Sequence, residues 1–313
     1  MSPFGSNFRS NCSPGRQSQS RRAAAGVLAA SAVVLTLSAP TAVARSAPAT
    51  SGDGPAYVAL GDSYASGAGL AGVKDKACDR TTGNYPGLIS QFASMVGPKH
   101  TFDDVTCSGA TTNNFWNPQG TNAPQVDALT PRTRLVTLTL GGNDVGFSSV
   151  LATCARVAAT DRDGTPCKQY FTAGGKDVLA ERVATMEGRV HDVLAEIKRR
   201  SPAAKVIVVG YPALFPDNGV GCAEVPFAKG DFAYLRDTTK QANAALRRQA
   251  KAEGVHASYA DTYTPTVGHD MCQPREERWI ESLTPAANTA AAHPNASGQF
   301  AMAVATLRQI YKP

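Results

Sequence analysis

The sequence alternates short apolar runs with longer amphipathic segments, and this alternation restricts the folds open to it. Within 176–200, apolar residues recur every three or four positions, which is the pattern of a helix that lies on a sheet. Runs such as "LVTLTL" at 135–140 are short and rich in β-branched residues, as buried strands are. Strands separated by helices predict parallel crossover connections. We therefore expect an α/β protein whose sheet is covered by helices on both faces.

Five strands and four long helices are expected. The strands are predicted at 57–60, 102–106, 135–140, 205–209 and 255–259, and the helices at 85–95, 176–200, 232–253 and 297–311. The pattern shows no internal repeat and no interdomain linker, so residues 56–313 are expected to form a single domain.

The first 44 residues differ from the rest. They hold four arginines and no acid, then an apolar run at 23–37, then an A-x-A site at Ala42 and Ala44. This is the layout of a secretory signal, and 15 apolar residues are short for a membrane span. We expect cleavage near Ala44, with 45–55 as a flexible mature N-terminus; a retained anchor is the alternative. The pair Arg21-Arg22 leaves both general and twin-arginine export open.

The basic charge of the chain comes largely from this leader. The whole chain has 31 basic and 25 acidic residues, and four of the basic ones precede residue 45, which leaves a net charge of +2. Such a balance does not predict binding to nucleic acid. The 42% hydrophobic content is that of a globular protein with a core.

Six cysteines remain once the leader, with Cys12, is removed. An even number in an exported chain predicts three disulfides, although six cysteines permit 15 pairings. We expect neighbours to pair because each bridge then closes a local loop: Cys78–Cys107, Cys154–Cys167 and Cys222–Cys272. Metal binding is the alternative, but the sequence has no C-x-x-C or Cys/His cluster with ligand spacing, and we expect no metal.

Small and polar residues follow three of the predicted strands. "GDS" ends the first, "CSGATTNN" the second and "GGNDVGF" the third. Parallel strands bring their carboxyl ends to one edge of the sheet, where ligands bind. A hydroxyl at such a strand end, that of Ser63, becomes a nucleophile only if a base takes its proton. His269 and His293 both lie in predicted loops, and His293 directly precedes the last helix, although a lone histidine is often structural.

A serine nucleophile that catalyses acyl transfer requires, besides a base, hydrogen-bond donors for the oxyanion that forms on the attacked carbonyl group. Backbone N–H groups at tight turns supply them, and Gly61 and Gly109 mark two such turns. The side-chain amide of Asn143 is a third candidate; alternatively, Asn143 caps a helix that starts near Val145.

Four sequence blocks carry a family resemblance. "GDS" at 61–63, Gly109 of "SGAT", "GGND" at 141–144 and "HP" at 293–294 resemble, in this order, the motif blocks of the SGNH-hydrolase superfamily, also called GDSL-type esterases and lipases. The sequence is most similar to the secreted bacterial lipase and phospholipase branch with three disulfides. The similarity covers about 56–311 and includes "TLTLGGNDVGF", "GYPALF" and "GHDMC".

The resemblance implies a fold and an activity. The fold is a three-layer α/β/α sandwich with a mainly parallel, five-stranded, flavodoxin-like sheet. The activity is that of a secreted, cofactor-free serine esterase or lipase, with Ser63 as nucleophile and His293 as base. The oxyanion hole is formed by the N–H groups of Ser63 and Gly109 and the side chain of Asn143. Lipid esters are the expected substrates, with transient contact to a lipid interface but no stable membrane insertion. Carbohydrate O-acetyl esters, or a non-catalytic binding role, are the alternatives.

One position departs from the family pattern. Many members carry an aspartate three residues before the histidine, and here that residue is Ala290. We therefore expect a Ser-His dyad in which the backbone carbonyl of Ala290 orients His293. A distant carboxylate, Asp261 or Asp270, is the alternative. No G-x-S-x-G motif surrounds the serine, so the chain is not expected to be an α/β-hydrolase lipase.

Overall fold

Five parallel strands form the central sheet of the computed structural model, which describes residues 56–312. Their order is β4-β1-β5-β6-β7, and each neighbouring pair is parallel. The strands are β1 (Ala56–Gly61), β4 (Phe102–Asp104), β5 (Thr133–Thr139), β6 (Lys205–Val209) and β7 (Ala257–Ala260). This order is that of a flavodoxin-like sheet: β4 is added on one side of β1, and β5, β6 and β7 on the other, so the strand order reverses at β1 and β5. The expected fold class is confirmed.

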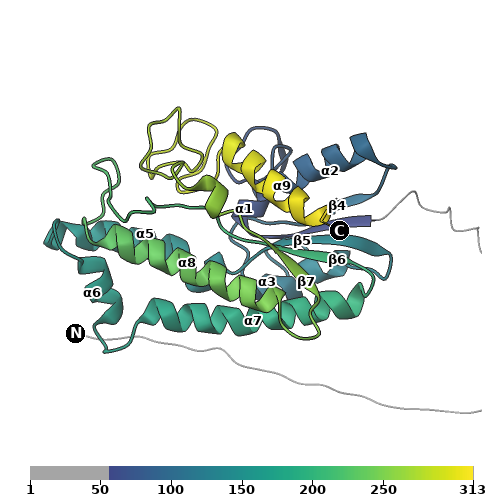
Figure 1. Cartoon of the computed structure of the whole chain (residues 1–313), viewed down its shortest axis with the longest axis horizontal. Coiled ribbons are helices and arrows are strands. Elements are labelled where there is room, and N and C mark those ends of the chain that lie inside the picture. Colours follow the sequence, from purple (N-terminus) through teal and green to yellow (C-terminus); the bar gives the residue numbers. More distant parts are fainter. Residues whose placement is uncertain (1–55, 313) are drawn as a thin grey trace, which may run out of the picture. The chain divides into compact units, whose positions relative to one another are not determined.

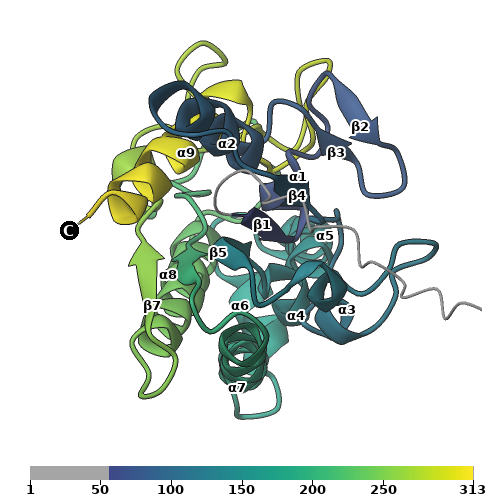
Figure 2. The ribbon, with the colours of Figure 1, turned by 90° about the vertical axis from the view of Figure 1, so that its right-hand side faces the viewer.

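Helices cover both faces of the sheet (Figures 1 and 2), with α2 and α9 on one face and α7 and α8 on the other. The long helices are α2 (Tyr85–Val96), α5 (Phe147–Val157), α7 (Val178–Arg200), α8 (Asp231–Ala250) and α9 (Ala296–Ile310). Shorter helices are α1 (Ser63–Ser66), α3 (Asn113–Trp116), α4 (Gly142–Val145) and α6 (Pro166–Thr172), with 3-10 turns at Gln125–Ala128, Ala158–Thr160 and Thr264–Thr266. A small antiparallel hairpin pairs β2 (Val73–Asp75) with β3 (Arg80–Thr81).

Burial follows the apolar pattern of the sequence. Residues 57–60 and 206–209 are each at most 2% exposed, as expected of central strands with a helical layer on each side. The buried residues of α7 repeat at the predicted three- and four-residue spacing: Leu179, Val183, Met186, Val190, Val193, Leu194 and Ile197.

Local side chains explain where the predicted boundaries were wrong. The second strand ends at Asp104, whose carboxylate accepts hydrogen bonds from the backbone N–H and hydroxyl of Thr106 and turns the chain. The last strand begins at Ala257 because His256 has a positive φ of 51°. Helix α5 was not predicted as a separate element; Gly146, at φ 80°, separates it from the short α4.

The structure pairs the six cysteines as sequence neighbours: Cys78–Cys107, Cys154–Cys167 and Cys222–Cys272. Among residues 56–312, no helix is both long and apolar enough to cross a membrane. The expected signal segment (1–44) and flexible N-terminus (45–55) lie outside the described residues.

Candidate active site

The serine of "GDS" stands at the carboxyl end of β1. Gly61 ends the strand with φ 146°, and a Cβ there would lie 2.4 Å from the carbonyl oxygen of Thr139 on β5, so glycine lets the two strands approach. Asp62 then caps α1 by accepting the backbone N–H of Tyr64 (3.0 Å). Ser63, the first residue of α1, is thereby held at the sheet edge and is 8% exposed.

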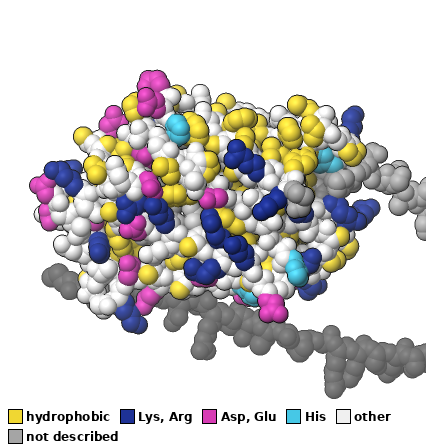
Figure 3. Space-filling model, in the orientation of Figure 1, with side chains coloured by type: hydrophobic (Ala, Val, Ile, Leu, Met, Phe, Trp, Pro, Cys, Tyr) yellow, Lys and Arg dark blue, Asp and Glu magenta, His cyan; other side chains and the backbone are white. Residues whose placement is uncertain are grey.

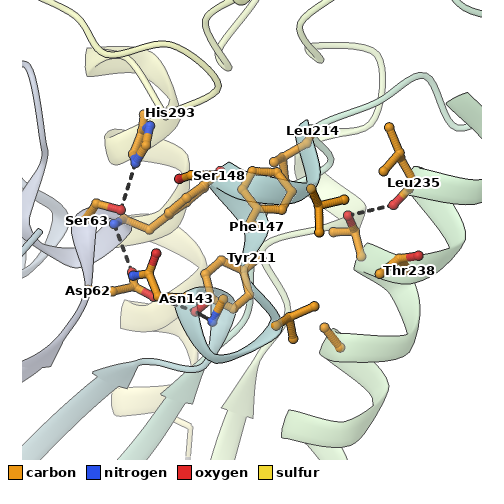
Figure 4. Close-up of a pocket in the computed structure, with 16 residues that line it drawn as sticks. Asp62, Ser63, Asn143, Phe147, Ser148, Tyr211, Leu214, Leu235, Thr238 and His293 are labelled. Carbon is orange, nitrogen blue, oxygen red and sulfur yellow. Dashed lines mark hydrogen bonds between the residues drawn. The ribbon is translucent and has the colours of Figure 1, made fainter. Parts of the chain in front are cut away.

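The loop before α9 brings a histidine to this serine. His293 Nε2 lies 2.7 Å from Ser63 Oγ (Figure 4). Its Nδ1 lies 2.7 Å from the carbonyl oxygen of Ala291. A carbonyl only accepts, so Nδ1 carries the proton and Nε2 accepts the serine hydroxyl. Burial lowers the pKa of His293, which keeps the ring neutral near pH 7. The pair therefore has the geometry of a nucleophile and its general base.

The predicted orienting carbonyl was wrong by one residue. Ala290 accepts the backbone N–H of His293 (3.2 Å), while Ala291 supplies the acceptor for the ring. The reason is the turn between them and the histidine, which no side-chain pattern reveals. Neither alternative carboxylate reaches the ring: Asp261 binds Thr264, and Asp270 accepts the N–H of Cys272 (2.9 Å).

Tyr64 connects α1, the helix that carries Ser63, to the loop that carries His293. Its hydroxyl donates to the carbonyl of Ala292 (2.6 Å), and its ring centroid lies 4.9 Å from that of His293. Ala292 has φ 59°, a left-handed conformation that is unfavourable for alanine, and it is 2% exposed. The tyrosine thus holds the strained residue that follows the orienting carbonyl. Sequence reasoning missed Tyr64; its only signal was its place directly after "GDS".

Asn143 comes from the turn after β5. Its amide nitrogen donates to the carbonyl of Ala110 (2.9 Å), which fixes the amide plane and leaves its second N–H for a ligand. Asn143 lies inside α4, whose N-cap is Gly141, so the capping alternative was wrong. Gly109, in the loop after β4, has φ 80° and is exposed; its N–H has no protein acceptor within 56–312.

A buried tyrosine joins the two turns. Tyr211 donates its hydroxyl to Asp62 (2.6 Å) and accepts the N–H of Gly142 (2.7 Å). Burial raises the pKa of Asp62 to about 7, although its hydrogen bonds to Tyr211 and Tyr64 favour the charged form. Asp62 thus links the turn of Ser63 to the turn of Asn143. Tyr211 lies in the quoted "GYPALF" segment, but sequence reasoning assigned it no role.

A largely apolar cavity opens at these groups. Ser63, Asn143 and His293 line it, whereas Gly109 does not. It extends from Ser63 past Phe147 and Leu214 to Leu235 and Thr238 on α8 (Figure 4). Its other lining residues are Asp62, Tyr64, Gly142, Val145, Ser148, Val150, Tyr211, Thr239 and Ala242. We call it the apolar cavity.

Comparison with known proteins agrees with this geometry. The model of the GDSL-like Lipase/Acylhydrolase family matches residues 59–300. The chain belongs to this family. It is a carboxylic ester hydrolase of the SGNH superfamily. No group of three or more His, Cys, Asp or Glu side chains in the described part of the chain could hold a metal ion.

Relatives of this family have similar lengths. Lipase 2 of Streptomyces coelicolor is 37% identical over 281 residues, which cover 87% of this chain and 92% of the relative. The crystal structure of phospholipase A1 from Streptomyces albidoflavus NA297 has a TM-score of 0.67 and 30% identity, covering 81% of this chain and 98% of that one. The extracellular lipase of Streptomyces rimosus gives a TM-score of 0.66 and 29% identity, over 82% and 99% of the chains.

Proposed function

We propose that Ser63 and His293 hydrolyse esters through an acyl-enzyme. The observation that carries the proposal is the pair of 2.7 Å contacts that join Ser63 Oγ, His293 and the Ala291 carbonyl. Ser63 Oγ attacks the ester carbonyl carbon while His293 Nε2 takes the hydroxyl proton. The tetrahedral intermediate then collapses, the C–O bond to the alcohol breaks, and His293 returns the proton to the departing oxygen.

The same groups serve the second half of the reaction. His293 takes a proton from water, the water oxygen attacks the acyl carbon, and Ser63 leaves with that proton. The Ala291 carbonyl accepts Nδ1–H throughout and stabilises the imidazolium formed in each transition state. The N–H groups of Ser63 and Gly109 and the amide of Asn143 are proposed to bind the developing oxyanion.

Lipid esters are the proposed substrates because of the apolar cavity. Among its lining residues, Asp62 and His293 are the groups that ionise near neutral pH, and both stand beside Ser63 rather than at the α8 end. The acyl chain would lie along Phe147 and Leu214 toward Thr238. A two-carbon acyl group would use only the mouth of the cavity, which disfavours an acetylesterase. The names of the Streptomyces relatives, lipases and a phospholipase A1, support the same substrates.

The protein is proposed to act outside the cell. Three disulfides favour an oxidising compartment, and the leader pattern at 1–44 favours export. We propose that the protein contacts the lipid interface, where its substrates lie, only transiently. On the face drawn in Figure 3, acidic and basic side chains are both present, which does not favour nucleic acid as a partner.

Hydrolysis of p-nitrophenyl esters from two to sixteen acyl carbons tests this function. We expect a preference for medium or long acyl chains. Ser63→Ala should lose all turnover, and it should no longer be labelled by a phosphonate probe that reacts with nucleophilic serines. Thr238→Phe narrows the α8 end of the apolar cavity and should shift the preference to shorter chains while retaining acetate hydrolysis. Thr185→Phe on α7 is the matched control. Thr185 is exposed, and the hydroxyls of Thr185 and Thr238 each donate to the carbonyl four residues earlier in their helix. Turnover by Ser63→Ala would refute the nucleophile assignment, and an unshifted profile in Thr238→Phe would refute the acyl path.

A further inference from the structure

Within residues 56–312, the loop at 107–112 leaves the backbone N–H of Gly109 without an acceptor. The other backbone N–H groups from Cys107 to Thr112 are all paired in the structure. Their acceptors are the carbonyls of Gly61, Cys78 and Cys107, the side chain of Asn114 and the carboxylate of Asp144. A free N–H in an otherwise paired loop can donate to a ligand, as the proposed oxyanion hole requires.

A glutamine side chain binds the opposite end of the same peptide group. Gln119 Nε2 donates to the carbonyl oxygen of Ser108 (2.7 Å). This carbonyl and the N–H of Gly109 belong to one planar trans peptide group, in which the oxygen and the hydrogen point in opposite directions. A donor that fixes the carbonyl therefore fixes the direction of the N–H. It also polarises the peptide group, which makes the N–H a stronger donor.

The position of Gln119 is set by its own turn. Its backbone exchanges two hydrogen bonds with Asn122, each 3.1 Å long, and Gly120 between them has φ 60°. From this turn the amide lies alongside Gly109, because Gln119 Nε2 is 3.6 Å from the point where a Cβ of residue 109 would stand. The Ser108 carbonyl is thus held from a segment that is fixed independently of the loop at 107–112.

The carbonyls on both sides of Gly109 are held by side-chain amides. Asn143 donates to the carbonyl of Ala110 (2.9 Å), and Gln119 donates to that of Ser108. Glycine has few steric limits on its backbone dihedrals, so Gly109 at φ 80° does not fix the orientation of its own N–H. Its two neighbours must supply that constraint.

The amide of Gln119 contributes little to stability by itself. Its Oε1 is buried and makes no hydrogen bond. A buried amide oxygen without a donor destabilises the folded state. An apolar side chain of the same length would fill this space without that cost. The favourable polar contact of the side chain is therefore its bond to Ser108.

We propose that Gln119 is a positioning residue of the oxyanion hole. It acts through the Ser108–Gly109 peptide group, whose N–H it directs and polarises toward the oxyanion. Gln119 does not line the apolar cavity, so it does not contact the acyl chain. This inference rests on the proposed ester hydrolysis at Ser63 and adds to it a residue that substrate does not touch.

Steady-state hydrolysis of p-nitrophenyl octanoate by Gln119→Met tests the proposal. Methionine keeps the length of the side chain and removes the donor. Both half-reactions pass through an oxyanion, so kcat should fall roughly tenfold whichever limits the rate, while KM should stay within about twofold. Gln119→Glu keeps the shape but cannot donate once it is ionised, so its kcat should fall at least as far.

Gln249→Met on α8 is the matched control. Gln249 is also half-buried, its Nε2 donates to Glu187 (3.0 Å), and it does not line the apolar cavity. This variant should keep its kcat, and the midpoint of unfolding in denaturant should fall no further in Gln119→Met than in the control. Unchanged kcat in Gln119→Met, or an equal loss of kcat in Gln249→Met, would overturn the proposal.

Inhibition by an alkyl trifluoromethyl ketone separates an effect on the oxyanion from a general loosening of the loop. Ser63 Oγ adds to the ketone carbon, its proton passes to His293, and the electron pair of the C=O π bond moves to the oxygen. In Gln119→Met, Ki for the ketone should rise by the factor by which kcat/KM falls. Ki for the alcohol of the same chain length, which forms no oxyanion, should not change.

Equal increases in Ki for the ketone and the alcohol, or no increase for the ketone, would overturn the role of Gln119. The proposed function is tested separately by Ser63→Ala. If that variant is inactive and Gln119→Met is fully active, the ester hydrolysis stands and only the positioning role fails. Retained turnover by Ser63→Ala would instead refute the proposed function itself.

Discussion

Tyr64→Phe tests how a chain without a triad acid holds its base. The change removes a hydroxyl that donates 2.6 Å to the carbonyl of Ala292, a residue that is 2% exposed. A buried carbonyl left unpaired costs about 1–3 kcal/mol. Ala292 is also in the left-handed region at φ 59°, a conformation that costs an alanine about 1–2 kcal/mol. Without the tyrosine, the turn is expected to relax and carry the Ala291 carbonyl away from His293 Nδ1.

If the cost of leaving the Ala292 carbonyl unpaired, about 1–3 kcal/mol, falls wholly on the transition state, kcat decreases roughly 5-fold to 150-fold. KM should change little, because phenylalanine keeps the ring that lines the apolar cavity. The assay is steady-state hydrolysis of one p-nitrophenyl ester, with unfolding in denaturant measured on the same protein.

Tyr57→Phe is the matched control. Tyr57 is 2% exposed, its hydroxyl bonds to Thr137 (2.8 Å), and it lies at the start of β1, roughly 13 Å of strand before Gly61. Both variants should lose stability, but only Tyr64→Phe should lose kcat. Unchanged kcat in Tyr64→Phe, or an equal loss in Tyr57→Phe, would refute the reasoning.

Three further predictions concern the same site. Because burial raises the pKa of Asp62 to about 7 from 3.8, the folded state holds this proton more tightly, and the free energy of unfolding should fall by up to about 4 kcal/mol between pH 4 and 7. Asp62→Asn should flatten that slope in denaturant unfolding, and identical slopes would contradict the assignment. Burial lowers the pKa of His293, so the acidic limb of kcat/KM should have its midpoint below 6.5; a midpoint above 6.5 in Asp62→Asn, which lacks the neighbouring group that titrates at about 7, would speak against His293 as the base. Asn143→Ala should lower kcat roughly 10²–10³-fold, the usual loss for one oxyanion donor, whereas a change confined to KM would assign Asn143 to substrate binding.

The sequence predicted the architecture because burial on both faces of a parallel sheet produces continuous apolar runs. The continuous apolar run at 57–60 predicts a strand buried on both faces, and the three- and four-residue spacing within α7 predicts one buried helix face. Both sets of residues are buried in the structure. The boundaries that failed depend on one side chain or one dihedral each, such as the carboxylate of Asp104 at the end of β4. A periodic pattern is recognised over many residues, so it does not detect a boundary that one side chain or one dihedral angle sets.

The sequence by itself also determined which residue types reach the sheet edge, since a motif placed directly after a parallel strand must lie at the carboxyl end of that strand. Ser63 and Asn143 follow β1 and β5 for this reason. Only the tertiary structure decided which carbonyl faces His293, because Ala290 and Ala291 have the same side chain and differ only in the direction of the main chain. It also decided that Tyr64 and Tyr211 tie the turns together, since hydrogen bonds across 228 and 149 positions of the chain have no local signature.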